Sequence, residues 1–450
     1  MKILHKTIKT VITAGIVATL IVFGTPALSH NAKHHEHEHT SHQILNGNPN
    51  TKLPVSYQPS AIYSSNKANS ALAPLDNKSL ISKKILAYRA SVRKNVVDLT
   101  SEEKHAFVDA VRTLKNTFLE GSTVSIYDQF VAVHVAAMGL MYEGAQGPAA
   151  GHDGAHESDL FLPWHREFIH RFEKALQLVN PKVTIPYWDW TDPKALEVIF
   201  QDDFMGPNGQ GVNLNIPDLG EVQGGPVASG PFSAANGWIL RSDLHIKPSG
   251  ESFGEVLLRF LQVPPTNSYP IPKEDEEQIL AINDYETFRL ALEGFIKLDS
   301  STQQPTSGVF QHNYFHSFVG GATFDPAVGR PEALGTMADL ASAINDPVFW
   351  LVHSNVDRLW AEWQVNGHAG SNYYPTTGGH YGENLNDRLW PWDGGESIPA
   401  NWGPGNLLSL LPTFSPNDIV TPADTLNFRK YGYTYDTLKG ANLTKLIPSS

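Results

Sequence analysis

Apolar residues recur at intervals of three and four in several stretches of the chain, which is the pattern of helices that bury one face. These stretches are residues 94–118, 125–142, 161–179, 284–298 and 346–364. Thr100 and Glu103 form a capping-box pattern in the first stretch. In the last, Asp346 and Pro347 place a proline where a first helical turn accepts it. The periodicity therefore predicts a mainly α fold.

Between these helices the chain has an irregular composition. Residues 202–237 are rich in Gly, Pro and Asn, which favours a surface rim or substrate loop over a second domain. A strand-like alternation appears near the end, in residues 426–438. We therefore expect one folded domain over residues 85–440, with long irregular loops and few short strands, and a short tail over residues 441–450.

The first 29 residues have the pattern of a secretory signal peptide. Lysines at positions 2, 6 and 9 precede the apolar run VITAGIVATLIVFG, which is short for a membrane span, and small residues follow up to Ser29. An uncleaved membrane anchor is the alternative. Residues 30–84 read as a histidine-rich tail and polar linker that cannot form a core. We expect a secreted or cell-envelope protein.

The net charge and the lack of cysteine exclude several classes of partner and of metal site. The formal net charge of −13, without a visible basic stripe, argues against nucleic acid and anionic membranes as partners. The chain contains no cysteine, which excludes disulfides, thiolate metal sites, iron–sulfur clusters and thiol nucleophiles. Histidine and carboxylate side chains remain as the strong metal ligands.

Six histidines fall into two groups of three along the chain. His312 and His316 are four residues apart, so on a helix their rings lie on one face and can share a metal ion. His353 lies inside an apolar run, where a bare imidazole needs a partner. The upstream group is His134, His156 and His165.

The composition of these groups favours copper. Dinuclear iron sites in helical bundles draw glutamates and Glu-x-x-His pairs, and no such pair occurs at these positions. Zinc can bind three histidines, but two all-histidine groups favour copper, which binds nitrogen ligands more tightly. We therefore interpret the six histidines as ligands of two copper ions that activate dioxygen.

The other histidines have simpler interpretations. His152 precedes His156 by four residues in the same loop and is the alternative ligand there. A lone histidine is more often a satisfied polar residue than a ligand. On that ground we interpret the rest as surface or structural residues: His105, His170, His245, His368 and His380.

Three motifs carry a resemblance to a known family. AHESDLFLPWHREF, HNYFHSFVGG and DPVFWLVHSNVDRLW resemble the two copper signatures of tyrosinases, the coupled-binuclear (type-3) copper proteins, and the resemblance extends over about residues 88–438. It implies a four-helix-bundle core that holds a dicopper site. The first copper would take His134, His156 and His165, and the second His312, His316 and His353. Gly154 stands where many plant, fungal and mollusc members have a cysteine, so the chain is most similar to bacterial tyrosinases.

The resemblance also implies an activity. Such an enzyme hydroxylates monophenols at the ortho position and oxidises o-diphenols to o-quinones with O2. Glu293 and Asn313 match the glutamate and asparagine that hold a water in bacterial tyrosinases, and that water would take the phenolic proton. A caddie protein for copper loading is a further implied partner, and the histidine-rich tail is a candidate for the same task. Asp357, one turn after His353, either orients a ligand ring or forms a simple ion pair.

Other functions fit the same residues. The nearest alternative is a catechol or o-aminophenol oxidase without monophenol hydroxylation. A haemocyanin-like oxygen-binding protein would use the same six ligands with the substrate path blocked. A secreted zinc hydrolase is the third alternative. The sequence predicts neither the natural phenol nor the oligomeric state.

Overall fold

The computed structural model describes residues 91–216, 220–325 and 330–438 of the 450-residue chain. The predicted signal peptide over residues 1–29, the tail and linker over 30–84 and the C-terminal tail over 441–450 all lie outside the described residues. Within the described part, no helix is long and apolar enough to cross a membrane.

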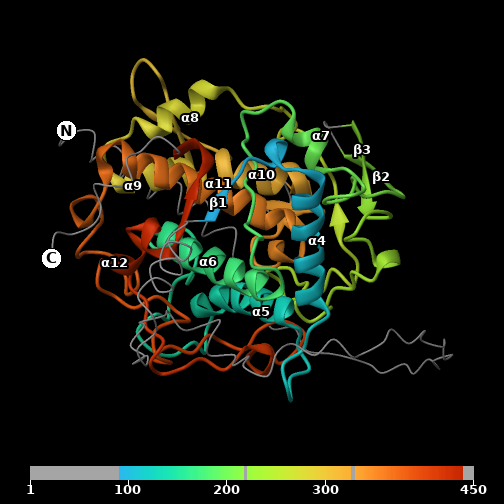
Figure 1. Ribbon diagram of the computed structural model, residues 1–450, viewed down its shortest axis with the longest axis horizontal. Coiled ribbons are helices and arrows are strands. Elements are labelled where there is room, and N and C mark those ends of the chain that lie inside the picture. Colours follow the sequence, from blue (N-terminus) through green and yellow to red (C-terminus); the bar gives the residue numbers. More distant parts are fainter. Residues whose placement is uncertain (1–90, 217–219, 326–329, 439–450) are drawn as a thin grey trace, which may run out of the picture.

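Helices dominate the described part, as the periodicity predicts. They are α4 (Ser101–Lys115), α5 (Ile126–Met138), α6 (Phe161–Val179), α7 (Ala195–Ile199), α8 (Lys273–Leu280), α9 (Tyr285–Glu293), α10 (Gln311–Gly320), α11 (Val348–Trp363) and α12 (Pro422–Thr425). The predicted capping box at the start of α4 is present, with Thr100 and Glu103 each bonded to the backbone of the other. Figure 1 shows α5 and α6 beside α10 and α11 at the centre of the molecule, with α4 along one side.

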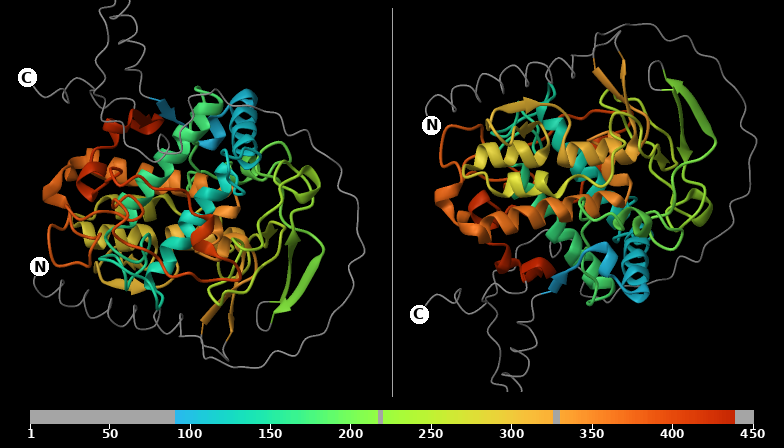
Figure 2. Two further views of the ribbon diagram at one scale, coloured as in Figure 1. Left: turned by 90° about the horizontal axis from the view of Figure 1, so that it is seen from below. Right: turned by 90° about the horizontal axis from the view of Figure 1, so that it is seen from above.

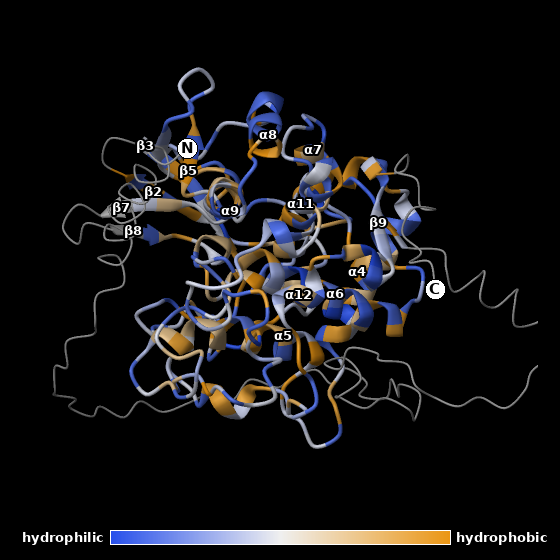
Figure 3. Ribbon diagram, turned by 90° about the vertical axis from the view of Figure 1, so that its left-hand side faces the viewer, coloured by the Kyte–Doolittle hydropathy of each residue, from blue (hydrophilic) through white to orange (hydrophobic). Residues whose placement is uncertain are grey.

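The core lies between these central helices. Every residue of α5 is buried, so this helix is packed against other parts of the protein around its whole circumference. Phe172 of α6 stacks on Trp350 of α11, with ring centroids 3.5 Å apart and ring planes 3° apart. Phe130 of α5 meets both rings edge-on. The hydropathy colouring of Figure 3 shows apolar segments on these helices and polar segments on outer helices such as α8. Aromatic packing thus joins the two halves of the bundle.

The strands are short and lie at the edges. Three-residue β1 (Ser91–Arg93) pairs in parallel with β9 (Tyr433–Tyr435), joining the two ends of the described part. The remaining strands are antiparallel: β2 (Val212–Ile216), β3 (Gly220–Pro226) and β4 (Leu258–Arg259) in one sheet, and the pairs β5 (Ile296–Leu298) with β6 (Pro305–Ser307) and β7 (Ala322–Asp325) with β8 (Arg330–Ala333). In Figure 2 the β2–β3 hairpin lies at one side of the molecule, away from the central helices.

Two local predictions need correction. The stretch 202–237 is not wholly irregular, because it contains the β2–β3 hairpin. The helix predicted over 284–298 ends at Glu293, and residues 296–298 form β5 instead. The helix ends there because Gly294 adopts a φ of 106°, which a left-handed C-terminal cap requires and glycine accepts most readily.

Candidate metal centre

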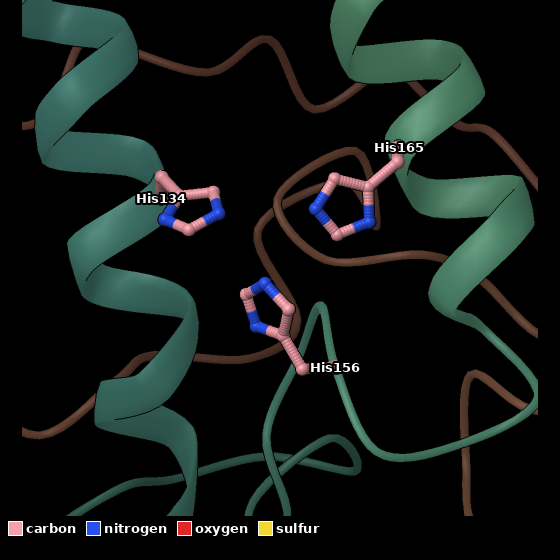
Figure 4. A group of neighbouring side chains, drawn as sticks. All are labelled: His134, His156 and His165. Atoms are coloured by element: carbon pink, nitrogen blue, oxygen red, sulfur yellow. The ribbon is translucent and has the colours of Figure 1, made fainter. Parts of the chain in front are cut away.

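The first histidine triad gathers side chains from two helices and the loop between them. His134 comes from α5, His165 from α6 and His156 from the intervening loop, and Figure 4 shows the three rings turned toward a common space. One ligand nitrogen of each ring lies within 4.8 Å of the others, and all three side chains are buried. The Nε2 atoms of His134 and His165 have no hydrogen-bond partner. Buried unpartnered nitrogens that converge in this way fit a metal ion.

The second triad converges even more closely. His312 and His316 lie one turn apart on α10, as their spacing predicts, and His353 faces them from α11. His353 Nε2 lies 3.2 Å from His312 Nε2 and 3.4 Å from His316 Nε2. Two nitrogens bound about 2 Å from one tetrahedral ion are about 3.3 Å apart. The triad therefore has the spacing of a three-imidazole metal site.

Hydrogen bonds at Nδ1 fix how two of the ligand rings face. His134 Nδ1 lies 2.9 Å from the carbonyl oxygen of Ala341, and His316 Nδ1 lies 2.8 Å from that of Met337. Each Nδ1–H donates to its carbonyl, which leaves the Nε2 lone pair free for a metal. Burial lowers the pKa of His134 to about 3 and that of His316 to about 4, so both rings are neutral at ordinary pH.

Two further ligand rings, those of His165 and His312, are also held by hydrogen bonds at Nδ1. His165 Nδ1 donates to the carbonyl of Phe161, one turn earlier in α6, at 2.9 Å. His312 Nδ1 lies 3.2 Å from the carbonyl oxygen of Glu293 and 3.0 Å from Asn313 Oδ1. Burial lowers the pKa of His165 and His312 well below the usual range. Both rings therefore remain neutral ligands.

The two triads adjoin each other. His165 of the first stacks on His353 of the second, with ring centroids 4.3 Å apart and planes 15° apart. Phe349 lies between the groups, 5.0 Å from the His134 ring and 4.0 Å from the His353 ring. Because ligand rings of both triads touch directly, two bound ions would share one site.

His156 differs from the other ligands, because its nearest partner is a carboxylate. Asp153 Oδ1 accepts hydrogen bonds from the backbone N–H of Ala155 at 2.7 Å and of His156 at 3.1 Å, and lies 3.3 Å from His156 Nδ1. Burial opposes protonation of His156, but Asp153 outweighs it, and the pKa of this imidazole is raised. Asp153 was not predicted from the sequence, although a bond from Asp to the second following N–H is a common loop pattern.

Glu293 and Asn313 both contact the His312 ring, Glu293 through its backbone carbonyl and Asn313 through Oδ1. The Glu293 carboxylate is buried and accepts the backbone N–H of Glu157 at 2.7 Å and a bond from Arg289 at 3.2 Å. Burial raises the pKa of Glu293, and the charge of Arg289 opposes this shift.

Glu157 was also not predicted from the sequence. Its φ is 62°, and burial followed by repulsion from Asp153 and Glu293 raises its pKa to about 7.

The histidines outside the triads do not share a metal group among the described residues. His152 turns toward the carbonyl of Tyr381, at 2.9 Å, and stacks on His380, which favours His156 as the loop ligand. His245 is buried and bonded at both ring nitrogens, to Gly254 and Thr336, as a structural histidine would be.

The hydrogen-bond partners of Asp357 do not include a ligand histidine. Of the two interpretations of Asp357, the structure therefore supports the ion pair. Its carboxylate accepts hydrogen bonds from two arginines and two tyrosines, Arg93, Arg166, Tyr433 and Tyr435. Burial opposes ionisation, but the two arginines lower the pKa of Asp357. Asp357 thus belongs to a buried ionic cluster beneath the site.

Comparison with known proteins gives matches over most of the described part. A family model described as the common central domain of tyrosinase matches residues 124–366, which include all six triad histidines, Glu293 and Asn313. A tyrosinase from Streptomyces glaucescens is 35% identical over 316 residues, covering 69% of this chain and 95% of the relative. A grixazone synthase from Streptomyces griseus is 31% identical over 371 residues, covering 77% and 99%. A solved polyphenol oxidase from Thermothelomyces thermophila superposes with a TM-score of 0.45 at 20% identity, covering 80% and 93%.

Proposed function

The chain belongs to the tyrosinase family, and from this membership we infer that it is a copper-dependent phenol oxidase. It hydroxylates monophenols at the ortho position and oxidises o-diphenols to o-quinones with O2. The observation that carries this function is the contact between two buried histidine triads through the stacked rings of His165 and His353. It is the arrangement that two ions need in order to act on one small molecule.

The two triads would hold one copper ion each, and the copper pair supplies the activation of dioxygen. The protein holds the ligand rings neutral by burial and aims their Nε2 atoms through the bonds at Nδ1. Phe349 packs against ligand rings of both triads, which keeps water away from their faces. Replacement of the ions by zinc would leave the fold intact and abolish oxidation.

We propose that a water held by Glu293 and Asn313 receives the phenolic proton; the backbone carbonyl of Glu293 and Oδ1 of Asn313 both contact the His312 ring. Each Glu293 carboxylate oxygen has one protein donor, Glu157 N–H or Arg289, which leaves lone pairs for a water or a proton. Burial raises the pKa of Glu293 above its usual value, which suits a general base.

One experiment tests the function and separates it from its alternatives. Copper per chain is measured on purified protein, and the same sample is assayed with tyrosine and with L-DOPA. Two coppers per chain and turnover of both substrates are expected. L-DOPA turnover with tyrosine at background would favour a catechol or o-aminophenol oxidase, a candidate kept by the match to a grixazone synthase. Reversible O2 binding without turnover, or zinc in place of copper, would refute the assignment.

Export and copper loading are proposals that rest on the N-terminal sequence. The lysine-rich start, apolar run and small residues up to Ser29 support a secreted or cell-envelope protein. N-terminal sequencing of the protein recovered outside the cytoplasm tests it, and a chain that stays intracellular with Met1 retained would refute it. A caddie protein or the histidines of residues 30–42 would deliver copper. The second source is tested by deleting the tail and measuring copper content when copper is limiting. An unchanged copper content would rule out delivery by the tail.

A further inference from the structure

One short segment between α10 and α11 contacts both metal triads. The carbonyl oxygen of Met337 accepts from His316 Nδ1 at 2.8 Å, and that of Ala341 accepts from His134 Nδ1 at 2.9 Å. His134 belongs to the first triad and His316 to the second. Five residues of backbone therefore link one ligand of the first triad to one ligand of the second.

This segment, residues 337–341, is largely buried and is held at both ends. Met337, Asp339 and Ala341 are each at most 3% exposed. At its C-terminal end, Asp339 Oδ1 accepts both the backbone N–H and the hydroxyl of Ser342, each at 3.0 Å. These bonds fold the backbone back on itself, so they fix the direction in which the Ala341 carbonyl points.

The N-terminal end of the segment is anchored through Thr336. The Thr336 hydroxyl oxygen accepts the backbone N–H of Leu258 at 3.1 Å and lies 2.9 Å from Nε2 of His245. His245 is itself bonded through Nδ1 to the carbonyl of Gly254, at 2.9 Å. The position of the Met337 carbonyl is thus set by long-range bonds to a separate part of the chain.

Three of the other four ligands have Nδ1 partners beside their own triad, and Nδ1 of the fourth, His353, has no hydrogen-bond partner among the described residues. His165 is bonded within its own helix to Phe161, and His156 has Asp153 in its own loop. His312 bonds to Glu293 and Asn313. A shift of Phe161, Asp153 or Asn313 would turn one ring of one triad. A shift of residues 337–341 would turn a ring in each.

From this geometry we propose that residues 337–341 form a shared clamp that sets the relative position of the two copper ions, and that Asp339 is the positioning residue of the clamp. This inference rests on the proposed function, because it requires that both triads bind copper. A carbonyl that accepts from Nδ1 fixes the rotation of the imidazole, and this rotation sets where Nε2 lies. Loosening one segment should therefore weaken both ions together.

The test compares copper retention in four full-length variants. A series of chelator concentrations gives the concentration that removes each of the two ions from wild type, Asp339→Ala, Asp339→Asn, Ser342→Ala and Asp153→Asn. Loss of a bond that orients a ligand typically lowers metal affinity 10–100-fold. In Asp339→Ala both concentrations should fall at least tenfold. Asp339→Asn keeps an acceptor oxygen and should stay within twofold of wild type. Asp153→Asn should shift one ion and not the other.

Each possible outcome either supports or overturns the clamp. The proposal is overturned if Asp339→Ala shifts only one ion, if it shifts neither beyond twofold, or if Asp339→Asn is as weak as Asp339→Ala. The melting temperature of the metal-free variants controls for a general loss of folding. If Asp339→Ala does not fold, Ser342→Ala decides, because it removes one donor alone: a parallel shift of both ions supports the clamp, and no shift refutes it. Wild type that binds fewer than two coppers would refute the proposed function instead.

Discussion

Replacement of Asp153 by Asn tests whether the carboxylate beside His156 strengthens the first copper site. Asn retains an oxygen that can accept the backbone N–H groups of Ala155 and His156, which Asp153 now binds at 2.7 and 3.1 Å. The loop conformation should therefore persist. What the substitution removes is a negative charge 3.3 Å from His156 Nδ1.

The magnitude follows from this distance. Two unit charges 3.3 Å apart interact by about 5 kcal/mol at an effective dielectric constant of about 20. A metal-bound imidazole carries only part of the charge of its ion, so the net effect is smaller. Removal of a partner of this kind usually costs 10–100-fold in metal affinity, which is about 1.4–2.7 kcal/mol. We expect one of the two coppers to bind Asp153→Asn about 10–100-fold more weakly.

Chelator competition with copper counted per chain measures the effect. Asp153→Asn should lose one ion at a 10–100-fold lower chelator concentration, while the second ion keeps its wild-type value. Asp109→Asn, at an exposed position of α4, is the matched control and should change neither. Equal retention of both ions in Asp153→Asn would refute the reasoning, because the carboxylate would then contribute nothing to binding.

Three further predictions follow from the described contacts. Glu293→Gln should lower tyrosine turnover at least tenfold more than L-DOPA turnover, with Glu286→Gln on the same helix as control; equal losses in steady-state assays would remove the base role. Asp357→Asn should lower the free energy of unfolding in urea by about 3–5 kcal/mol, because it leaves Arg166 without its carboxylate partner and leaves Arg93 with Glu173 alone, yet leave two coppers per chain; a loss of copper at native conditions would restore a role in ligand orientation. Metal-free protein should lose stability as pH falls from about 6.5 toward 4, because burial lowers the pKa of His134 to about 3 and of His316 to about 4, so unfolding takes up protons there. Each such histidine contributes up to about 1.4 kcal/mol per pH unit, and melting temperatures that stay flat across that window would contradict it.

The sequence by itself determined the local elements and the ligand set. The bounds of α6, the capping box of α4 and the pairing of His312 with His316 on one helical face all depend on residues within a few positions of one another. Helical periodicity and caps are local properties, so a single sequence contains them. Five of the six triad histidines were predicted for the same reason, since they lie in short contiguous motifs, and His134 lies on a predicted helix outside those motifs.

Only the tertiary structure decided how these parts meet. The carbonyls of Met337 and Ala341 carry no sequence signal, because every residue has one and only the fold selects which two reach the ligand rings. Asp357 follows His353 by one turn, yet its partners are arginines and tyrosines from distant segments. The contacts that orient His134 and His316 join residues far apart in the chain, and sequence spacing cannot specify such contacts.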